Sequence, residues 1–280
     1  MASRMHPGAR RVDARFKGEH VLGNHDGKHE PSIASSPFIT GQEGGRVMRP
    51  RAVIPELLRP DFTIEEAERL QDTFKRGIKL QPFPLPRTVT GVDIAYQTTT
   101  STGAVAAAIT MKIPSLEIVE TAQVTGACIF PYVPGLLGFR ELDLVSRALY
   151  TMEQPIEVLL YDGHGIAHPR RFGAASQLGL AFGIPSIGCA KNPFHGTIRG
   201  PLSPGRFATA PITDDATGDV LGVAMRMQEN VKPIYVSPGH LVDIDSAVTI
   251  VRACAGSHRL PEPLRQADQV ARKHVTFFED

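Results

Sequence analysis

The chain has 280 residues, of which 42% are apolar, and it carries a formal net charge of +1. This length and composition allow one large domain or two small ones with a substantial core. No apolar run approaches the length of a membrane span, and no apolar segment follows the basic start of the chain. We therefore expect neither a membrane helix nor a secretory signal. The three cysteines are widely spaced in apolar surroundings, which favours reduced thiols in the cytoplasm.

Charge is distributed unevenly along the chain. Residues 1–50 contain eight Lys or Arg and five Asp or Glu, so residues 51–280 contain 22 and 24. The main part is therefore slightly acidic, and any phosphate-binding surface must be a local patch. The first part is rich in Gly, His, Arg and Ser and has no periodicity. We therefore expect residues 1–55 to be a disordered extension and residues 56–280 to form the folded domain.

The first half of the folded part predicts a helix followed by three strands. Thr63-Ile-Glu-Glu66 has the pattern of a capping box, and apolar residues continue at helical spacing towards Pro82. Short links between the three strands predict an antiparallel meander. A loop rich in proline and glycine then leads into a second helix. The strands are expected at residues 87–96, 104–113 and 116–130, and the second helix at residues 137–152.

The second half alternates strands and helices around a short buried strand, Val158 to Tyr161. This run is apolar at every position, as expected for a strand that is covered on both faces. Together with the meander, the alternation predicts an α/β fold with one mixed β-sheet and helices on both of its faces. The other strands are expected at residues 185–190, 220–227 and 234–236, and the helices at residues 174–182, 246–255 and 263–274.

Three acids stand where elements begin or end, or inside a strand. Asp93 lies within the first strand, where a buried carboxylate is costly unless it is paired with a cation. Asp162 follows the short buried strand directly, and Glu141 stands in the first turn of a helix. Taken singly, a strand-end aspartate more often caps a turn, and a first-turn glutamate more often favours the helix dipole. As a set they offer the oxygen ligands that Mg²⁺ prefers, which predicts a magnesium site.

Basic side chains accompany these acids. Lys191 ends a predicted strand and is a candidate to neutralise charge that develops on a phosphate. Arg170 and Arg171 follow the glycine-rich loop after Asp162 and are candidates to bind a phosphate. His240 ends the last strand, and we expect it beside the carboxylates, either as a general acid–base group or as a structural histidine.

The candidate residues belong to five stretches that occur in order along the chain. On these stretches the chain resembles the endonuclease V family, inosine-directed nucleases with a ribonuclease-H-like fold, over residues 60–275. The stretches are Gly91-Val-Asp-Ile-Ala-Tyr96, Pro131-Tyr-Val-Pro-Gly-Leu-Leu-Gly-Phe-Arg-Glu141, Asp162-Gly-His-Gly-Ile-Ala-His-Pro-Arg-Arg171, Gly188-Cys-Ala-Lys191, and Gly239-His240 with Asp245-Ser246-Ala247.

The resemblance implies a Mg²⁺-dependent endonuclease of DNA repair, in which Mn²⁺ can substitute. Its substrate would be DNA that contains deoxyinosine, a deaminated adenine. The cut would fall at the second phosphodiester bond on the 3′ side and leave 3′-hydroxyl and 5′-phosphate ends. Asp93, Glu141 and Asp162 would be the metal carboxylates, with Lys191 and His240 close to them. We expect the protein to be a cytoplasmic monomer.

The resemblance also implies which residues contact the nucleic acid. The wedge that enters it at the lesion would be the loop of Pro131, Tyr132, Val133 and Pro134. Further contacts would come from Gly163, His164, Arg170 and Arg171. The prolines restrict the backbone around Tyr132, so its ring would be presented at low ordering cost. The alternative is that Tyr132 packs on the core of the domain.

Two departures from the family pattern concern substrate binding. The family commonly has a basic or polar residue after the Gly-His pair, where this chain has Leu241. Residues 1–55 have no counterpart in the compact bacterial members. Two alternative functions also stay open: an inosine-specific endoribonuclease, and a non-catalytic module that binds damaged nucleic acid.

Overall fold

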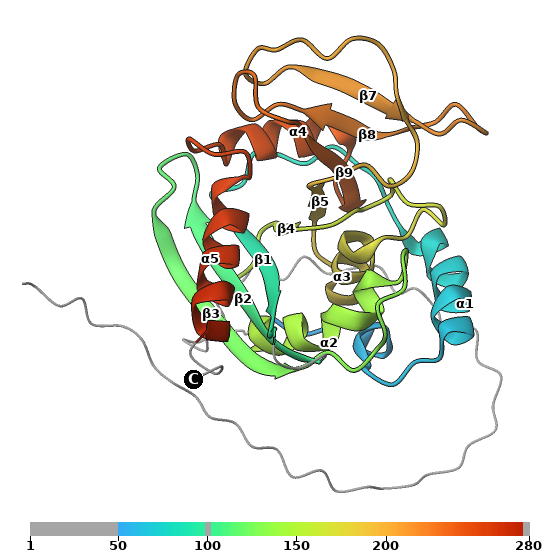
Figure 1. Ribbon diagram of the computed structural model, residues 1–280, viewed down its shortest axis with the longest axis vertical. Coiled ribbons are helices and arrows are strands. Elements are labelled where there is room, and N and C mark those ends of the chain that lie inside the picture. Colours follow the sequence, from blue (N-terminus) through green and yellow to red (C-terminus); the bar gives the residue numbers. More distant parts are fainter. Residues whose placement is uncertain (1–49, 99–101, 277–280) are drawn as a thin grey trace, which may run out of the picture. The chain divides into compact units, whose positions relative to one another are not determined.

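The computed structural model describes residues 50–98 and 102–276, which form one mixed sheet with helices on both faces (Figure 1). Within these residues the sheet has nine strands in the order β3-β2-β1-β4-β5-β9-β8-β7-β6, so the predicted α/β fold is confirmed. Most of the predicted extension, residues 1–49, lies outside the described residues. The strands span Thr88–Tyr96 (β1), Gly103–Lys112 (β2), Ile118–Ala127 (β3), Leu159–Tyr161 (β4), Ser186–Ala190 (β5), Thr197–Ile198 (β6), Thr209–Thr213 (β7), Val220–Met225 (β8) and Ile234–His240 (β9).

The centre of the sheet positions two of the predicted acids. β1, β2 and β3 form the predicted antiparallel meander, whereas β4 runs parallel to both β1 and β5. Val92 of β1 is paired with Tyr161, the last residue of β4. Asp93 and Asp162 therefore follow paired residues on neighbouring strands.

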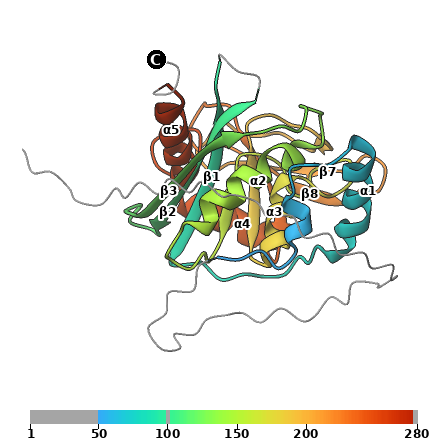
Figure 2. The same ribbon diagram turned by 90° about the horizontal axis from the view of Figure 1, so that it is seen from below.

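Helices cover both faces of the sheet (Figure 1 and Figure 2). α2 and α3 pack on one face, in a core that includes Val92 and Leu159. α4 packs on the other face with Leu160 and Ile187, and α5 continues that layer over Ile109 of β2. Successive residues of β4 thus enter different cores, which is why this strand is apolar at every position. The α-helices span Ile64–Phe74 (α1), Leu137–Tyr150 (α2), Ala174–Phe182 (α3), Ile244–Ala253 (α4) and Glu262–Thr276 (α5), and two 3-10 helices span Pro55–Leu58 (η1) and Lys75–Gly77 (η2).

α1 packs against the segment that leads into α2. Thr63 caps its N-terminus, where the side-chain oxygen accepts a hydrogen bond from the N–H of Glu66 at 3.1 Å, as the capping box predicts. Ala67 of α1 is fully buried in an apolar cluster with Phe130 and Phe139. α1 therefore supports the two ends of the proline-rich loop that connects β3 to α2.

The segment before η1 is hydrogen-bonded to the end of α3. Val53 and Ile54 both donate backbone N–H groups to the carbonyl of Ala181 in α3, at 2.7 and 3.0 Å. Ile54 also packs on the core beneath α2 and α3. These contacts precede the boundary expected between residues 55 and 56, and that boundary stays a prediction.

Two strands have no counterpart in the predicted set. β6 is only two residues long, and both are exposed, so it has no apolar pattern to recognise. β7 contains Pro211, and a proline within a run weakens the case for a strand. Both were missed because the pairing of β7 with β8 forms them, not a pattern of their own.

Two expectations from composition concern cysteines and membrane helices. Cys128, Cys189 and Cys254 are buried and not in disulfides, which agrees with the expected reduced thiols. Within residues 50–98 and 102–276, no helix is long and apolar enough to cross a membrane.

Candidate active site

Asp93 and Asp162 lie side by side at the centre of the sheet. They follow the paired residues Val92 and Tyr161 of two parallel strands, so the same register brings them together. Burial raises the pKa of both carboxyl groups, and the charge of Asp162 raises the pKa of Asp93 further. Two buried like charges destabilise each other unless a cation lies close to both.

Lys191 supplies one such cation. It follows β5, and its ammonium group forms an ion pair with Asp162, whose side chain is 14% exposed. Burial lowers the pKa of Lys191, but the neighbouring Asp162 carboxylate outweighs this, and the pKa is raised. The guanidinium of Arg259 fixes the backbone here, because it donates to the carbonyls of Lys191 and of Pro233 at the start of β9. The predicted proximity of Lys191 and Asp162 is therefore present in the structure.

Glu141 is hydrogen-bonded to two tyrosines. Its carboxylate accepts hydrogen bonds from the Tyr96 hydroxyl at 2.6 Å and from the Tyr161 hydroxyl. Burial raises the pKa of Glu141, and both phenols counteract that rise. Across residues 50–98 and 102–276, no three His, Cys, Asp or Glu side chains lie close enough to hold a metal ion together. The three expected carboxylates are therefore not gathered around one point in the described residues, and the role of Glu141 as a metal ligand stays a prediction.

A cleft of about 410 Å³ opens beside Asp162 and Lys191. The proline-rich loop forms one wall, and the segments that follow β4 and β5 form the others. Tyr132 stands at this wall with 70% of its surface exposed, whereas Val133 packs on the cluster beneath α1. Tyr132 therefore projects into solvent and does not pack on the core. The lining residues are Tyr132–Gly135, Leu137, Asp162–His164, His168, Gly173, Ala174 and Ala190–Phe194.

Two neutral histidines and a phenylalanine form the floor of the cleft. The rings of His164 and His168 lie 5.7 and 5.5 Å from that of Phe194, measured between centroids. Burial lowers the pKa of each histidine to about 4, so both are uncharged near neutral pH. Nδ1 of His164 is buried without a hydrogen-bond partner. The cleft thus has aromatic side chains in its lining, which suits a flat heterocycle.

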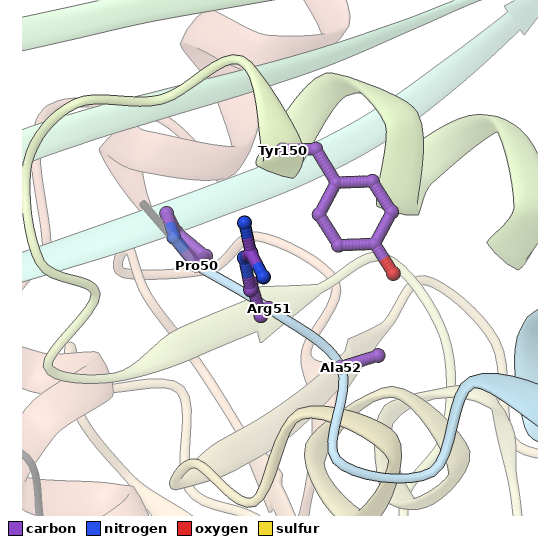
Figure 3. Close-up of a pocket in the computed structure, with 4 residues that line it drawn as sticks. All are labelled: Pro50, Arg51, Ala52 and Tyr150. Atoms are coloured by element: carbon purple, nitrogen blue, oxygen red, sulfur yellow. The ribbon is translucent and has the colours of Figure 1, made fainter. Parts of the chain in front are cut away.

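A second hollow, of about 440 Å³, lies at the far end of α2 (Figure 3). Figure 3 shows the ring of Tyr150 facing Pro50, Arg51 and Ala52. Tyr150 is the last residue of a 14-residue helix, so it lies about 20 Å from the start of α2 near Glu141. This hollow has no acid in its lining and is separate from the candidate active site.

Comparison with known proteins identifies the family to which this site belongs. The sequence model of the Endonuclease V family matches residues 71–269, which is most of the chain and includes every acid described above. The chain belongs to the endonuclease V family. It is therefore an endonuclease, a hydrolase that acts on DNA, and this decides against the non-catalytic binding module.

Relatives of known sequence and structure agree with this assignment. An endonuclease V of Streptomyces avermitilis is 44% identical over 214 residues, which cover 75% of this chain and 92% of that relative. The crystal structure of endonuclease V from the same species has a TM-score of 0.73 at 41% identity, and the match covers 81% of this chain and 98% of that one. A Ciona intestinalis endonuclease V variant, in complex with a 23mer DNA containing an inosine followed by a ribo-adenosine, has a TM-score of 0.69 at 26% identity, with 78% and 100% covered. The predicted ribonuclease-H-like fold is thereby confirmed.

The endonuclease V site has the donors that a hard divalent cation requires. The family generally uses a divalent metal ion. Asp93 and Asp162 present oxygen ligands in a partly dry position where one lysine faces two carboxylates, so a further positive charge would be stabilised. The residues present therefore fit such an ion.

A fourth acid, Asp268, was not predicted from the sequence. It lies on α5, which packs along β1 (Figure 1), and its charge raises the pKa of both Asp93 and Asp162. Its carboxylate is paired with Arg272, one turn later, at 2.8 Å. An Asp and an Arg four residues apart are typical of an ion pair on a helix surface, so the sequence did not mark Asp268 as a site residue. It could have been found by asking which polar residues of the last helix face β1, because a helix that covers this strand directs one side towards Asp93.

His240 does not lie beside the carboxylates, and the prediction that placed it there is wrong. β9 is antiparallel to β5, and His240 pairs with Ser186 at the start of β5, about 16 Å along the strand from Lys191. Its Nδ1 accepts a hydrogen bond from the N–H of Lys79 at 3.3 Å, and burial lowers its pKa to about 4. His240 is a structural histidine. The sequence shows that a strand ends there but not at which edge of the sheet.

The two arginines predicted to bind phosphate are both paired within the chain. Arg170 forms an ion pair with Glu68 of α1 at 2.6 Å, and Arg171 forms one with Asp214 at 2.9 Å. Asp214 also accepts a hydrogen bond from His195. This bond is the largest of several that lower the pKa of Asp214 to about 2. Either arginine would have to leave its carboxylate to contact a phosphate. In the structure these ion pairs connect loops, which the sequence did not predict, and phosphate binding by the two arginines stays a prediction.

Proposed function

We propose that this chain cleaves DNA containing deoxyinosine at the second phosphodiester bond on the 3′ side, with Mg²⁺ or Mn²⁺ as cofactor, in DNA repair. The observation that carries the proposal is the juxtaposition of Asp93, Asp162 and Lys191 beside an aromatic cleft and an exposed tyrosine. Asp162 and Lys191 line the cleft, so the acids that would bind a cation lie next to the cavity that would take a base. The crystallised Ciona relative in complex with inosine-containing DNA supports the same substrate class.

Each side chain of the site has a separate task in this proposal. Asp93 and Asp162 hold the divalent ion, with Glu141 and Asp268 approaching from opposite faces of the sheet. When bound, the ion supplies an activated water and stabilises negative charge on the leaving oxygen. Lys191 adds a fixed positive charge next to the scissile phosphate.

The loop and the cleft select the nucleotide. Tyr132, supported by Pro131, Val133 and Pro134, fills the gap that an extruded base leaves in the duplex. Extrusion costs a few kcal/mol, and less for a mispaired base such as hypoxanthine. The extruded base enters the cleft, which Gly163 and His164 line beside Asp162.

The proposal is tested with end-labelled oligonucleotides and the full chain. A duplex with one deoxyinosine and the matching ordinary duplex are incubated with Mg²⁺ or with chelator, and the products are sized. The expected result is one cut at the second bond 3′ to inosine, only with the metal ion. The Asp162→Asn variant should bind the duplex and not cut it. Equal cutting of the ordinary duplex, or more than about a tenth of wild-type rate in the variant (a loss of less than ~1.4 kcal/mol), would overturn the proposal.

A ribonucleotide substrate is a second candidate, favoured by one observation. The DNA in the Ciona complex carries a ribo-adenosine immediately after the inosine. Adding an inosine-containing RNA of the same sequence to the assay separates the two substrates by their kcat/KM values.

We further propose that the protein acts in the cytoplasm, which agrees with its three free cysteines, and that it is a monomer.

A further inference from the structure

One buried glutamine of α1 connects the two loops that border the cleft. The side-chain amide nitrogen of Gln71 donates to the carbonyl of Gly135 at 2.8 Å and to that of Phe172 at 2.9 Å. Gly135 ends the proline-rich loop with Tyr132, and Phe172 ends the loop that begins with Asp162. Gln71 is 1% exposed, so solvent cannot replace these bonds.

The other side chains around Gly135 strengthen this connection. Nδ1 of His168 accepts from the N–H of Arg170 at 3.1 Å, so the neutral ring carries its proton on Nε2 and donates to the carbonyl of Gly135 at 2.9 Å. Glu68, on the same helix as Gln71, is paired with Arg170. α1 is therefore linked by hydrogen bonds and one ion pair to both walls of the cleft.

We propose that Gln71 is a positioning residue that holds the Tyr132 loop at a fixed distance from the Asp162 loop. This inference rests on the proposed function, in which Tyr132 enters the duplex while Asp162 acts at the scissile bond. Without the Gln71 amide, the carbonyl of Phe172 stays buried and unpaired, and that of Gly135 keeps only its bond from His168. No side chain then bonds to both loops, and the Phe172 loop moves to bring its carbonyl to water. The tyrosine then no longer reaches the duplex at the register that the acids require, because a displacement of about 1 Å is costly in a positioned site.

The unpaired oxygen of Gln71 indicates which half of the amide matters. Oε1 is buried without a hydrogen-bond partner, whereas the nitrogen has two. Gln71→Met keeps the length of the side chain and removes the donor, and Gln71→Glu places a second oxygen against the two carbonyls. Gln177 is the matched control, since it is equally buried and donates to the carbonyl of Leu57 at 2.7 Å, away from the cleft.

The first readout follows the loop without any substrate. The chain contains no tryptophan, so Tyr132→Trp gives a single fluorophore at the tip of the loop. In this background, Gln71→Met should lower the fluorescence anisotropy of Trp at that position, and Gln177→Met should leave it unchanged although it too lowers Tm. Equal anisotropy in the Gln71 and Gln177 variants would show that Gln71 serves stability alone.

The second readout is cleavage of inosine in duplex and in single-stranded DNA. Gln71→Met in the otherwise wild-type chain should reduce kcat/KM on the duplex at least about 5-fold more than on the single strand, as expected for two lost hydrogen bonds. Gln177→Met should reduce both equally. If the wild-type chain does not cut DNA at inosine, the proposed function is wrong, and the anisotropy result still tests the position of the loop. If Gln71→Met changes neither the duplex preference nor the anisotropy, Gln71 is not a positioning residue.

Discussion

Asp93 and Asp162 oppose folding at the pH at which they would serve catalysis. Burial raises the pKa of both carboxyl groups. A raised folded-state pKa means that the contribution to stability is present below the unfolded value of about 4 and is lost as pH rises through the folded value. The metal-free protein is therefore destabilised by both acids near neutral pH.

Replacing Asp93 by asparagine should stabilise the metal-free protein and inactivate it. Asn is nearly isosteric and carries no charge, so the repulsion with Asp162 disappears. Calorimetry at pH 7.5 with chelator should show a rise in Tm, about 2–4 °C for each kcal/mol of repulsion removed. Asp61→Asn, at a side chain that is 70% exposed, is the control and should change nothing. A fall in Tm for Asp93→Asn would contradict the electrostatic account.

At the scale of single elements, the loop between β3 and α2 combines a fixed base with a free tip. Val133 and Leu136 pack beneath α1, whereas Tyr132 is 70% exposed. An aromatic ring stacked in a gap of the duplex returns about 1–3 kcal/mol. Tyr132→Ala should therefore lower kcat/KM on duplex inosine DNA about 5–150-fold and on single-stranded DNA much less.

Two variants separate stacking from general loss of surface. Tyr132→Phe keeps the ring and should retain most of the duplex activity. Ile129→Ala removes an apolar side chain that is 58% exposed but does not line the cleft, so duplex preference should persist. An equal loss on both substrates in Tyr132→Ala, with a lowered Tm, would assign the tyrosine to the core.

The β7–β8 hairpin is connected to the Asp162 loop through Arg171. The backbone of Arg171 has φ of +57°, and its guanidinium contacts both Asp214 and Asp219. Arg171→Ala should lower Tm by about 2–4 °C and leave the salt dependence of DNA binding unchanged. If Arg171 instead binds a phosphate, the plot of log K for DNA binding against log salt concentration should become less steep by about 0.9 in the variant. Binding constants measured over a series of salt concentrations distinguish the structural role from phosphate binding.

The sequence predicted the centre of the site better than its surroundings. Asp93 and Asp162 were found because each interrupts or ends an apolar strand, and because parallel strands bring such positions together. His240 was misplaced because the antiparallel direction of β9 is a property of long-range pairing. Asp268 was missed because α5 approaches the sheet from a distant part of the chain. Local patterns identified the elements, while packing decided which of their ends meet.

At the scale of the whole molecule, three buried histidines make stability depend on pH. Burial lowers the pKa of His164, His168 and His240 to about 4 each. The unfolded chain binds protons at about pH 6.5, so the stability that these residues contribute is lost as pH falls from about 6.5 to 4. The raised pKa values of Asp93 and Asp162 make the protein more stable as pH falls, which is the opposite effect. The unfolding free energy of the wild type, measured against pH, therefore contains both effects.

His240→Gln isolates one histidine, because glutamine has an oxygen that can accept from Lys79. The difference in unfolding free energy between wild type and variant should change by up to about 1.4 kcal/mol per pH unit between pH 6 and pH 4.5. Activity at pH 7.5 should stay within about 2-fold once corrected for folded protein, since His240 lies at the other edge of the sheet. A constant difference across this pH range would show that the buried ring is already charged.

The four acids arrive from four separate segments and from both faces of the sheet. Asp93 and Asp162 stand at its centre, Glu141 comes from α2 on one side, and Asp268 comes from α5 on the other. α5 is the last helix of the described chain, so it is synthesised after the segments that carry the other three acids. In the proposed active site, a nascent chain would therefore lack Asp268 until α5 has docked on β1. The order of the segments would then keep the nuclease inactive until this helix covers the sheet.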